Sequence, residues 1–285
     1  AMKYEPDIIW TPVLMHKCDE NQNIIEYDFA HWINCVKENK FYSTKEEVRK
    51  AWINFDRMKL SANQANLYKT ELALKHPFRN DIYGADYLFN IQIANDVNSV
   101  YVMSEPVYDF MNYQSDNMNA SIGKFYGYEH EMYNIFYTDN MELYKGWNAW
   151  NLDTMVYITR KRLQALSSEI GILNSSNCKL DLEQKLQKVM QDSADELIQE
   201  CITSLNAQEE FECRVLSGIK NILINEKPDE LNKYYFLYEL LESLLRYEKT
   251  EEDYQKIKNA IYHPLNKAQI GLTLYKKISD RKHLF

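Results

Sequence analysis

The hydrophobic positions divide the chain into two kinds of sequence. In the N-terminal half, apolar residues come in short runs. Residues 7–15 and 99–103 are typical of buried strands, the first broken near Pro12, and residues 24–25 and 106–110 of shorter extended pieces. In the C-terminal part, apolar residues recur at intervals of three and four, which predicts amphipathic helices. Short connections between these helices predict antiparallel neighbours and a bundle of about four members.

One helix start is marked by its capping residues. Ser43 or Thr44 can cap the N-terminus, and Glu46 or Glu47 can complete a capping box. The other helices are predicted from hydrophobic spacing and boundary residues. They cover residues 27–37, 87–95, 125–137, 153–166 with a basic C-terminal end, 182–205 and 211–223, and two more begin near residues 228 and 250.

These elements predict an α+β, helix-dominated fold in two domains. The α+β portion covers residues 2–150 and the α-helical bundle residues 151–285, with a polar linker at residues 174–177. Seven glycines and six prolines are too few for a loop-rich all-β fold or a glycine-rich phosphate loop. With 45% hydrophobic and 26% charged residues, the composition is that of an ordinary globular protein.

Charge and cysteine content narrow the classes of function. A net charge of −9 argues against nucleic acid as a partner, because backbone phosphates require a basic face. No apolar run approaches the roughly 18 residues of a membrane span. The five cysteines are irregularly spaced, as in reduced thiols, so we expect a cytoplasmic protein. His16 with Cys18, and His31 with Cys35, fit no common closed zinc site.

Residues 78–121 carry the clearest candidate chemistry. Asp86 follows Gly84 directly before a predicted helix, whose free N–H groups would stabilise an ionised carboxylate. Such a carboxylate can act as a general base. The alternative is an aspartate that only caps the helix N-terminus.

The order of motifs in this stretch resembles the second half of the catalytic domain of family 2 inverting glycosyltransferases of the GT-A fold. The matching segments are Tyr83-Gly84-Ala85-Asp86, Leu88-Phe89-Asn90, Val100-Tyr101-Val102 and Glu105-Pro106-Val107-Tyr108. Residues 7–10 are similar to a strand that follows the donor-binding half in that family. The resemblance implies a partial GT-A-like sheet in which Asp86 deprotonates the acceptor hydroxyl.

The same resemblance implies substrates and a cofactor. The expected reaction moves a sugar from a nucleotide-diphosphate donor to a hydroxyl of a glycan or protein, assisted by Mn²⁺ or Mg²⁺, as in bacterial glycan biosynthesis. Beside Asp86, it implies substrate contacts by Tyr83, Gly84, Tyr108, Tyr113 and Asn117. The donor-binding half, with its Asp-x-Asp motif, would lie before residue 1. The chain is therefore expected to be a piece of a longer enzyme or a remnant that binds no nucleotide sugar.

Two departures from the family pattern stand beside Asp86. Ala85 replaces the glutamate that usually precedes the base, and Tyr113 stands near the position of a family histidine; a tyrosine can still hydrogen-bond a phosphate.

His130, between two glutamates, is a candidate metal ligand or acid-base residue.

The rival hypothesis is a non-enzymatic helical module that binds a protein or glycan. In this hypothesis the aromatic residues between 122 and 150 and the C-terminal bundle form the partner surface, and Asp86 only caps a helix.

Overall fold

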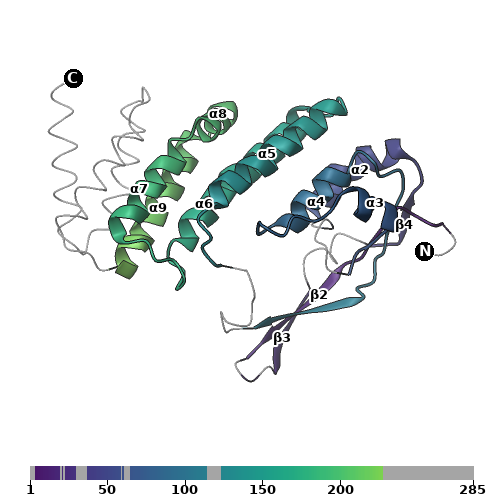
Figure 1. The fold of residues 1–285 in the computed structure, drawn as a ribbon, viewed down its shortest axis with the longest axis horizontal. Helices are drawn as coiled ribbons and strands as arrows, with labels where there is room; N and C mark the ends of the chain where they lie inside the picture. Colours follow the sequence, from purple (N-terminus) through teal and green to yellow (C-terminus); the bar gives the residue numbers. More distant parts are fainter. Residues whose placement is uncertain are drawn as a thin grey trace. The chain divides into compact units, whose positions relative to one another are not determined.

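The described residues form helices α2–α9 and two small mixed sheets, which confirms the α+β, helix-dominated fold class (Figure 1). They divide into two compact units, the first made of residues 1–122 and 138–154, the second of residues 123–137 and 155–285. The structure is a computed structural model that describes residues 4–19, 21, 23–29, 37–58, 60, 65–113 and 123–226.

The first sheet lies in the first unit and has the strand order β4-β6-β1-β5. Strand β6 (Val100–Val102) runs parallel to β1 (Ile8–Trp10), whereas β4 (Lys40–Tyr42) and β5 (Leu67–Tyr68) are antiparallel edge strands. Asp7 anchors the start of β1, because its carboxylate accepts hydrogen bonds from the Asn98 and Ser99 amides and from Lys69. The two central strands, β1 and β6, contain the buried residues that the sequence predicts: Ile8, Trp10, Val100 and Val102.

The second sheet has the order β3-β2-β7 and begins where the first strand breaks. Strand β2 (Val13–Cys18) pairs antiparallel with β3 (Ile24–Phe29) and parallel with β7 (Tyr108–Tyr113). The break predicted near Pro12 therefore separates strands of two different sheets. The Asp19 carboxylate accepts amide hydrogen bonds at the turn of the hairpin, as expected for a polar turn.

One predicted helix is wrong at its start. Residues 27–29, expected to begin a helix over residues 27–37, are the last residues of β3. Their pairing with β2 satisfies the backbone groups that a helix would otherwise use. Residues 30–36 lie outside the described residues.

Helix α2 (Lys45–Arg57) confirms the predicted capping box and apolar face. Thr44 accepts a hydrogen bond from the amide of Glu47, whose carboxylate accepts one from the amide of Thr44. The buried face of the helix packs Trp52 and Phe55 against Trp10 of β1. Two further helices, α3 (Thr70–Lys75) and α4 (Ala85–Ile93), connect β5 to β6.

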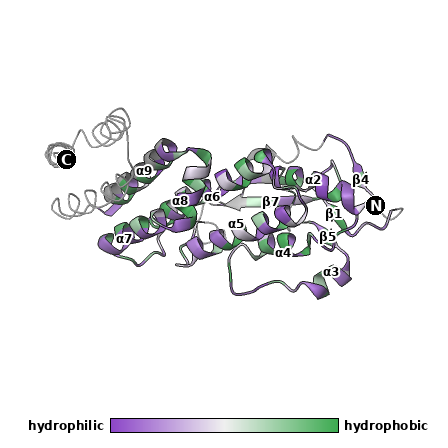
Figure 2. Ribbon diagram, turned by 90° about the horizontal axis from the view of Figure 1, so that it is seen from above, coloured by the Kyte–Doolittle hydropathy of each residue, from purple (hydrophilic) through white to green (hydrophobic). Residues whose placement is uncertain are grey.

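The second unit is helical and is built on a continuous apolar core. Helices α5 (Glu129–Gly146) and α6 (Leu152–Ile172) begin or end in it, and α7 (Leu182–Ser193), α8 (Glu196–Leu205) and α9 (Gln208–Glu226) lie wholly inside it. Hydrophilic and hydrophobic residues alternate along these helices (Figure 2), as amphipathic packing requires. The buried residues of the core are Leu163, Leu166, Ile170, Leu173, Leu186, Val189, Ile198, Cys201, Ile202, Phe211, Val215, Ile219 and Ile222.

Two helix boundaries differ from the sequence prediction. The segment expected as one helix over residues 182–205 is divided at Asp195, which caps α8 through the amides of Leu197 and Ile198. Helix α6 continues past residue 166 to Ile172. The basic residue Arg162 is thus inside the helix, where it forms a buried ion pair rather than stabilising a C-terminal dipole.

The polar segment at residues 174–177 joins α6 and α7 within the second unit. Asn177 accepts a hydrogen bond from the Phe125 amide and donates one to the Phe125 carbonyl, so the segment is tied to the chain before α5. The helices predicted beyond residue 226 lie outside the described residues. Of the helices that the structure describes, none has the length and apolar character to cross a membrane.

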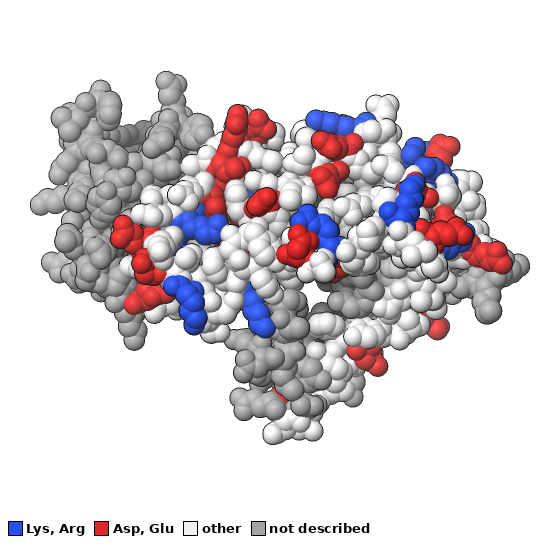
Figure 3. All heavy atoms as spheres, in the orientation of Figure 1, with Lys and Arg blue, Asp and Glu red and all other residues white. Residues whose placement is uncertain are grey.

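Charged side chains of both signs are interspersed over the described residues on the face shown in Figure 3. Exposed ion pairs of the described residues include Lys50 with Glu46 and Arg57 with Asp153. Pairs of this kind contribute little to stability, because water screens both charges.

Candidate functional site

The predicted base lies in the first turn of α4. Gly84 is the N-cap residue, and its φ of 83° places it in the left-handed region that favours glycine. Asp86 is the second residue of the helix. Gly84 is thus the N-cap residue in place of Asp86, but the Asp86 carboxylate still accepts a hydrogen bond from a first-turn amide, as the capping alternative expects.

The carboxylate of Asp86 is half-buried and keeps few partners. It accepts a hydrogen bond of 2.8 Å from the amide of Tyr87, and among the described residues no basic side chain pairs with it. Asp153, in the first turn of α6, offers a contrast, since Arg57 binds both of its oxygens at 2.8 and 2.9 Å. The Asp86 carboxylate thus lies at the N-terminal end of α4 with a backbone amide as its hydrogen-bond donor.

Tyr68 of β5 is linked through Asn90 to the backbone of Asp86. Its hydroxyl donates to the side chain of Asn90 at 3.1 Å, and the Asn90 amide group donates to the backbone carbonyl of Asp86 at 2.9 Å. Burial raises the pKa of Tyr68, and the negative charge of Asp86 raises it further. The phenol therefore stays protonated at neutral pH and remains a hydrogen-bonding group near the carboxylate.

Tyr87, in the same helical turn as Asp86, is linked to α5 by a hydrogen bond. Its hydroxyl accepts a hydrogen bond of 3.1 Å from Asn140 of α5. Burial, and then the charge of the buried Asp56, raises the pKa of Tyr87 well above its usual value. The phenol is thus a neutral anchor between α2, α4 and the first-unit part of α5.

A small cavity of about 10 Å³ lies beside this anchor. Small-molecule sites usually occupy roughly 300–1,000 Å³, so this pocket is too small for a sugar nucleotide. We interpret it as part of the packing behind α4. It is lined by Trp10, Trp52, Phe55, Asp56, Tyr87, Asn90, Ile91 and Asn140.

The other predicted substrate contacts are spread over several elements. Tyr83 is half-buried in the turn before α4, directly ahead of Gly84. Tyr108 is exposed at the start of β7, and Tyr113 ends that strand, in the second sheet. Among the described residues, no hydrogen bond or ring contact joins Tyr108 to α4. Asn117 lies outside the described residues.

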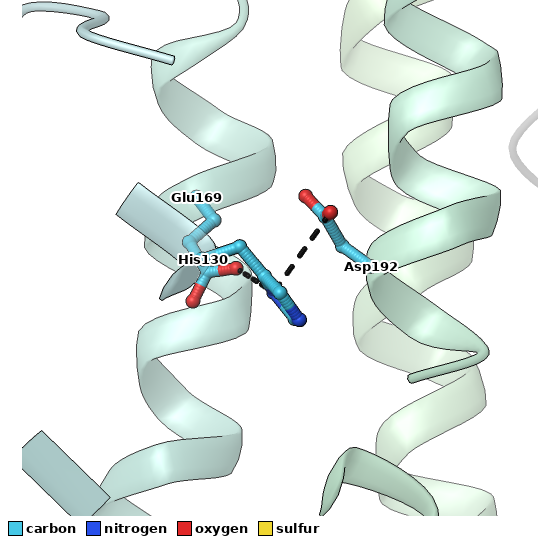
Figure 4. A group of neighbouring side chains, drawn as sticks. All are labelled: His130, Glu169 and Asp192. Carbon is cyan, nitrogen blue, oxygen red and sulfur yellow. Dashed lines mark hydrogen bonds and ion pairs between the residues drawn. The ribbon is translucent and has the colours of Figure 1, made fainter. Parts of the chain in front are cut away.

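His130, the candidate metal ligand, lies in a second cluster in the second unit. Figure 4 shows its ring between Glu169 of α6 and Asp192 of α7. Nδ1 of His130 lies 2.8 Å from an oxygen of Glu169 and 3.9 Å from one of Asp192, and Nε2 lies 3.5 Å from Asp195. Arg162 donates to the other oxygen of Glu169 at 2.7 Å.

The surroundings of His130 favour its protonated form. Burial lowers the pKa of His130, but the hydrogen bond to Glu169 and the charges of Glu169 and Asp192 outweigh burial, so that the pKa is raised. Lys188 pairs with Asp192, so three carboxylates face two permanent cations, and an imidazolium at His130 equalises the charges.

The ligand atoms of His130, Glu169 and Asp192 do lie within 4.8 Å of one another, as a metal site requires. However, a nitrogen of the Arg162 guanidinium lies only 3.1 Å from Nδ1 of His130. A divalent ion bound there would face this guanidinium in a buried site, which costs electrostatic energy. The set of residues therefore fits a proton-linked ion-pair network.

Comparison with models of known protein families, with curated proteins and with solved structures finds no match for this chain. The sequence identifies Asp86 and His130 as candidates. It does not identify the residues that surround each of them in the structure. The spacing of Arg162 and Glu169, two helical turns apart, was the one local signal for the ion pair. The positions of Tyr68 and Asp192 follow only from the folded chain.

Proposed function

We propose that the first unit carries the acceptor side of an inverting glycosyltransferase, with Asp86 as the general base. The observation that carries this proposal is a half-buried carboxylate in the first turn of α4, with no basic partner among the described residues. The sheet of parallel β1 and β6 with α4 leading into β6, and the motif resemblance of residues 83–90, support it further.

In the proposed reaction, the Asp86 carboxylate accepts the proton of the acceptor hydroxyl. The acceptor oxygen forms a bond to the anomeric carbon of the donor sugar as the bond from that carbon to the diphosphate oxygen breaks. The diphosphate leaves with the electron pair, and the anomeric configuration inverts. Tyr68 and Asn90 keep the turn and its polar surroundings in place.

The proposed reaction would use Mn²⁺ or Mg²⁺ at the diphosphate. The described residues around Asp86 do not fit such a cation site, because the sequence has no Asp-x-Asp and the one ligand group found is the His130 cluster of the second unit. We therefore assign no step through the metal ion to these residues.

The test is sugar transfer by the full-length natural protein that contains this chain, with a panel of nucleotide-diphosphate sugars and Mn²⁺. We expect Asp86→Asn to lower kcat by about 10²-fold or more, the usual contribution of a general base. Asp153→Asn is the matched control, because it changes a first-turn aspartate that is already paired with Arg57. Equal rates for wild type and Asp86→Asn would remove Asp86 from the mechanism.

A further inference from the structure

Phe78 is a large apolar side chain that remains 50% exposed next to the proposed site. One face of its ring is covered, because it stacks on buried Phe89 of α4 with the ring centroids 4.2 Å apart and the planes inclined by 20°. The exposed area therefore lies outside this covered face. Phe89 therefore packs against one face of the Phe78 ring, and the residue remains open to solvent elsewhere.

The ring that supports Phe78 lies on the same face of α4 as Asp86. Phe89 follows Asp86 by three residues, and residues at this spacing are neighbours on a helix surface. Tyr68, whose pKa is raised in part by the charge of Asp86, packs edge-on against Phe89 with centroids 5.2 Å apart. Phe78, Phe89 and Tyr68 thus form one continuous group of rings beside the helical turn of Asp86, which we name the α4 platform.

Polar groups follow Phe78 directly in the sequence. Arg79, the next residue after Phe78, donates to both oxygens of Asp81 at 3.0 and 2.6 Å, and both side chains are largely exposed. An exposed aromatic face bordered by fixed donors and acceptors suits a pyranose ring, whose C–H face is apolar and whose hydroxyls lie at the rim. A lipid chain or an extended peptide would use neither the flat face nor the charged edge as well.

We infer that Phe78 is the stacking surface for a pyranose ring of the acceptor, so that the acceptor is a carbohydrate. The inference rests on the proposed function for the identity of the group that reacts, but the binding itself requires neither a donor nor turnover. Single exposed aromatic residues are common on protein surfaces. What distinguishes Phe78 is its stacking on a buried ring one helical turn from an unneutralised carboxylate.

The test measures sugar binding to the chain by NMR of ring-labelled phenylalanine. The Phe78 signals are those that disappear in the Phe78→Leu variant. The probes are the methyl α- and β-pyranosides of the common hexoses and N-acetylhexosamines and their β-linked disaccharides. We expect at least one of these probes to shift the Phe78 ring signals. Phe78→Ala should weaken that binding about tenfold, equivalent to about 1.4 kcal/mol, and Phe78→Trp should retain it.

Tyr126→Ala is the matched control, because Tyr126 is a similarly exposed aromatic residue of the second unit. The inference is overturned if no probe shifts the Phe78 signals, or if Tyr126→Ala abolishes binding and Phe78→Ala does not. In the transfer assay, Phe78→Ala should raise the KM for the acceptor about tenfold with little change in kcat.

The two proposals can fail separately. Binding at Phe78 that persists in Asp86→Asn, without any transfer, would leave a glycan-binding unit and reject the base. Transfer that depends on Asp86 but has the same acceptor KM in Phe78→Ala would reject only the stacking surface.

Discussion

Asp86 and Glu169 are both carboxylates on helices, and the two units treat them in opposite ways. Asp86 lies in the first turn of α4, half-buried, with a backbone amide as its hydrogen-bond donor. Glu169 lies inside α6, buried, with Arg162 on one oxygen and His130 on the other. A carboxylate without an ion-pair partner can exchange a proton with a bound molecule. A buried carboxylate held by ion pairs cannot do so without breaking those pairs, which destabilises the fold.

The largest effect is expected from breaking the enclosed pair. Arg162→Met should leave Glu169 as a buried charge beside a weaker partner and destabilise the protein by about 3–5 kcal/mol. Denaturant unfolding followed by circular dichroism measures this change. Arg214→Met is the control, because Arg214 forms a more exposed pair with Glu210 on α9, and its loss should cost less than about 1 kcal/mol. Equal losses in the two variants would contradict the distinction.

A smaller loss is expected at the start of α4. Gly84→Ala places a side chain in the left-handed conformation at φ 83°, which costs about 1–2 kcal/mol. Gly146→Ala, at the end of α5, is the matched control, because an added Cβ there would meet no atom within 4 Å. Thermal unfolding should show a lower Tm for Gly84→Ala alone. An unchanged Tm would mean that the turn before Asp86 adapts freely.

The pH dependence of stability distinguishes the two units further. Because the pKa of His130 is raised in the folded state, its stabilising effect is complete below its unfolded pKa of about 6.5 and is lost as pH rises through the higher folded value. The free energy of unfolding of the wild type should therefore fall as the pH rises from the low sixes into the alkaline range. His130→Gln should flatten this slope, and an equal slope in the variant would place the titrating group elsewhere.

Burial raises the pKa of Asp192 as well, more than His130 and Lys188 lower it. This acid also binds its proton more tightly in the folded state. Its contribution falls as pH rises through a window that begins near its ordinary value of 3.8, well below that of His130. Comparison with an Asp192→Asn variant then separates the contribution of the histidine from that of Asp192.

The smallest effect is expected at Asp86 itself. Asp86→Asn should change the free energy of unfolding by no more than about 0.5 kcal/mol, because the side chain is half-buried and pairs with no basic residue among those described. The same denaturant titrations measure it. A loss as large as that of Arg162→Met would show that Asp86 is structural, and any loss of transfer could then be a loss of fold.

Local signals in the sequence were sufficient for much of the fold. The capping box at Thr44 and the break at Pro12 depend on neighbouring residues only, and both occur as predicted. The helix predicted over residues 27–37 rests on the apolar residues Trp32, Ile33 and Val36, and only the pairing with β2 places residues 27–29 in a strand. Asp195 was overlooked as a helix start because the apolar stripe continues on both sides of it.

The candidate sites show the same limit. Asp86 and Gly84 are adjacent in sequence, so their place at the start of a helix could be predicted. The group around His130 brings together α5, α6 and α7 from positions up to 62 residues apart, and the sequence held no rule for that assembly. The stacking of Phe78 on Phe89 is likewise a contact across a turn, which hydrophobic spacing alone does not reveal.

The passage of one extended segment from β1 into β2 couples the two sheets mechanically. Thr11 and Pro12 between them are buried, and the Thr11 amide donates to the side chain of Asn66. A shift of one residue in the pairing of either sheet would turn Trp10 or Val13 outward. It would also shift the pairing of the other sheet, because the two strands are joined directly. The two sheets therefore share a single alignment, fixed by a corner of only two residues.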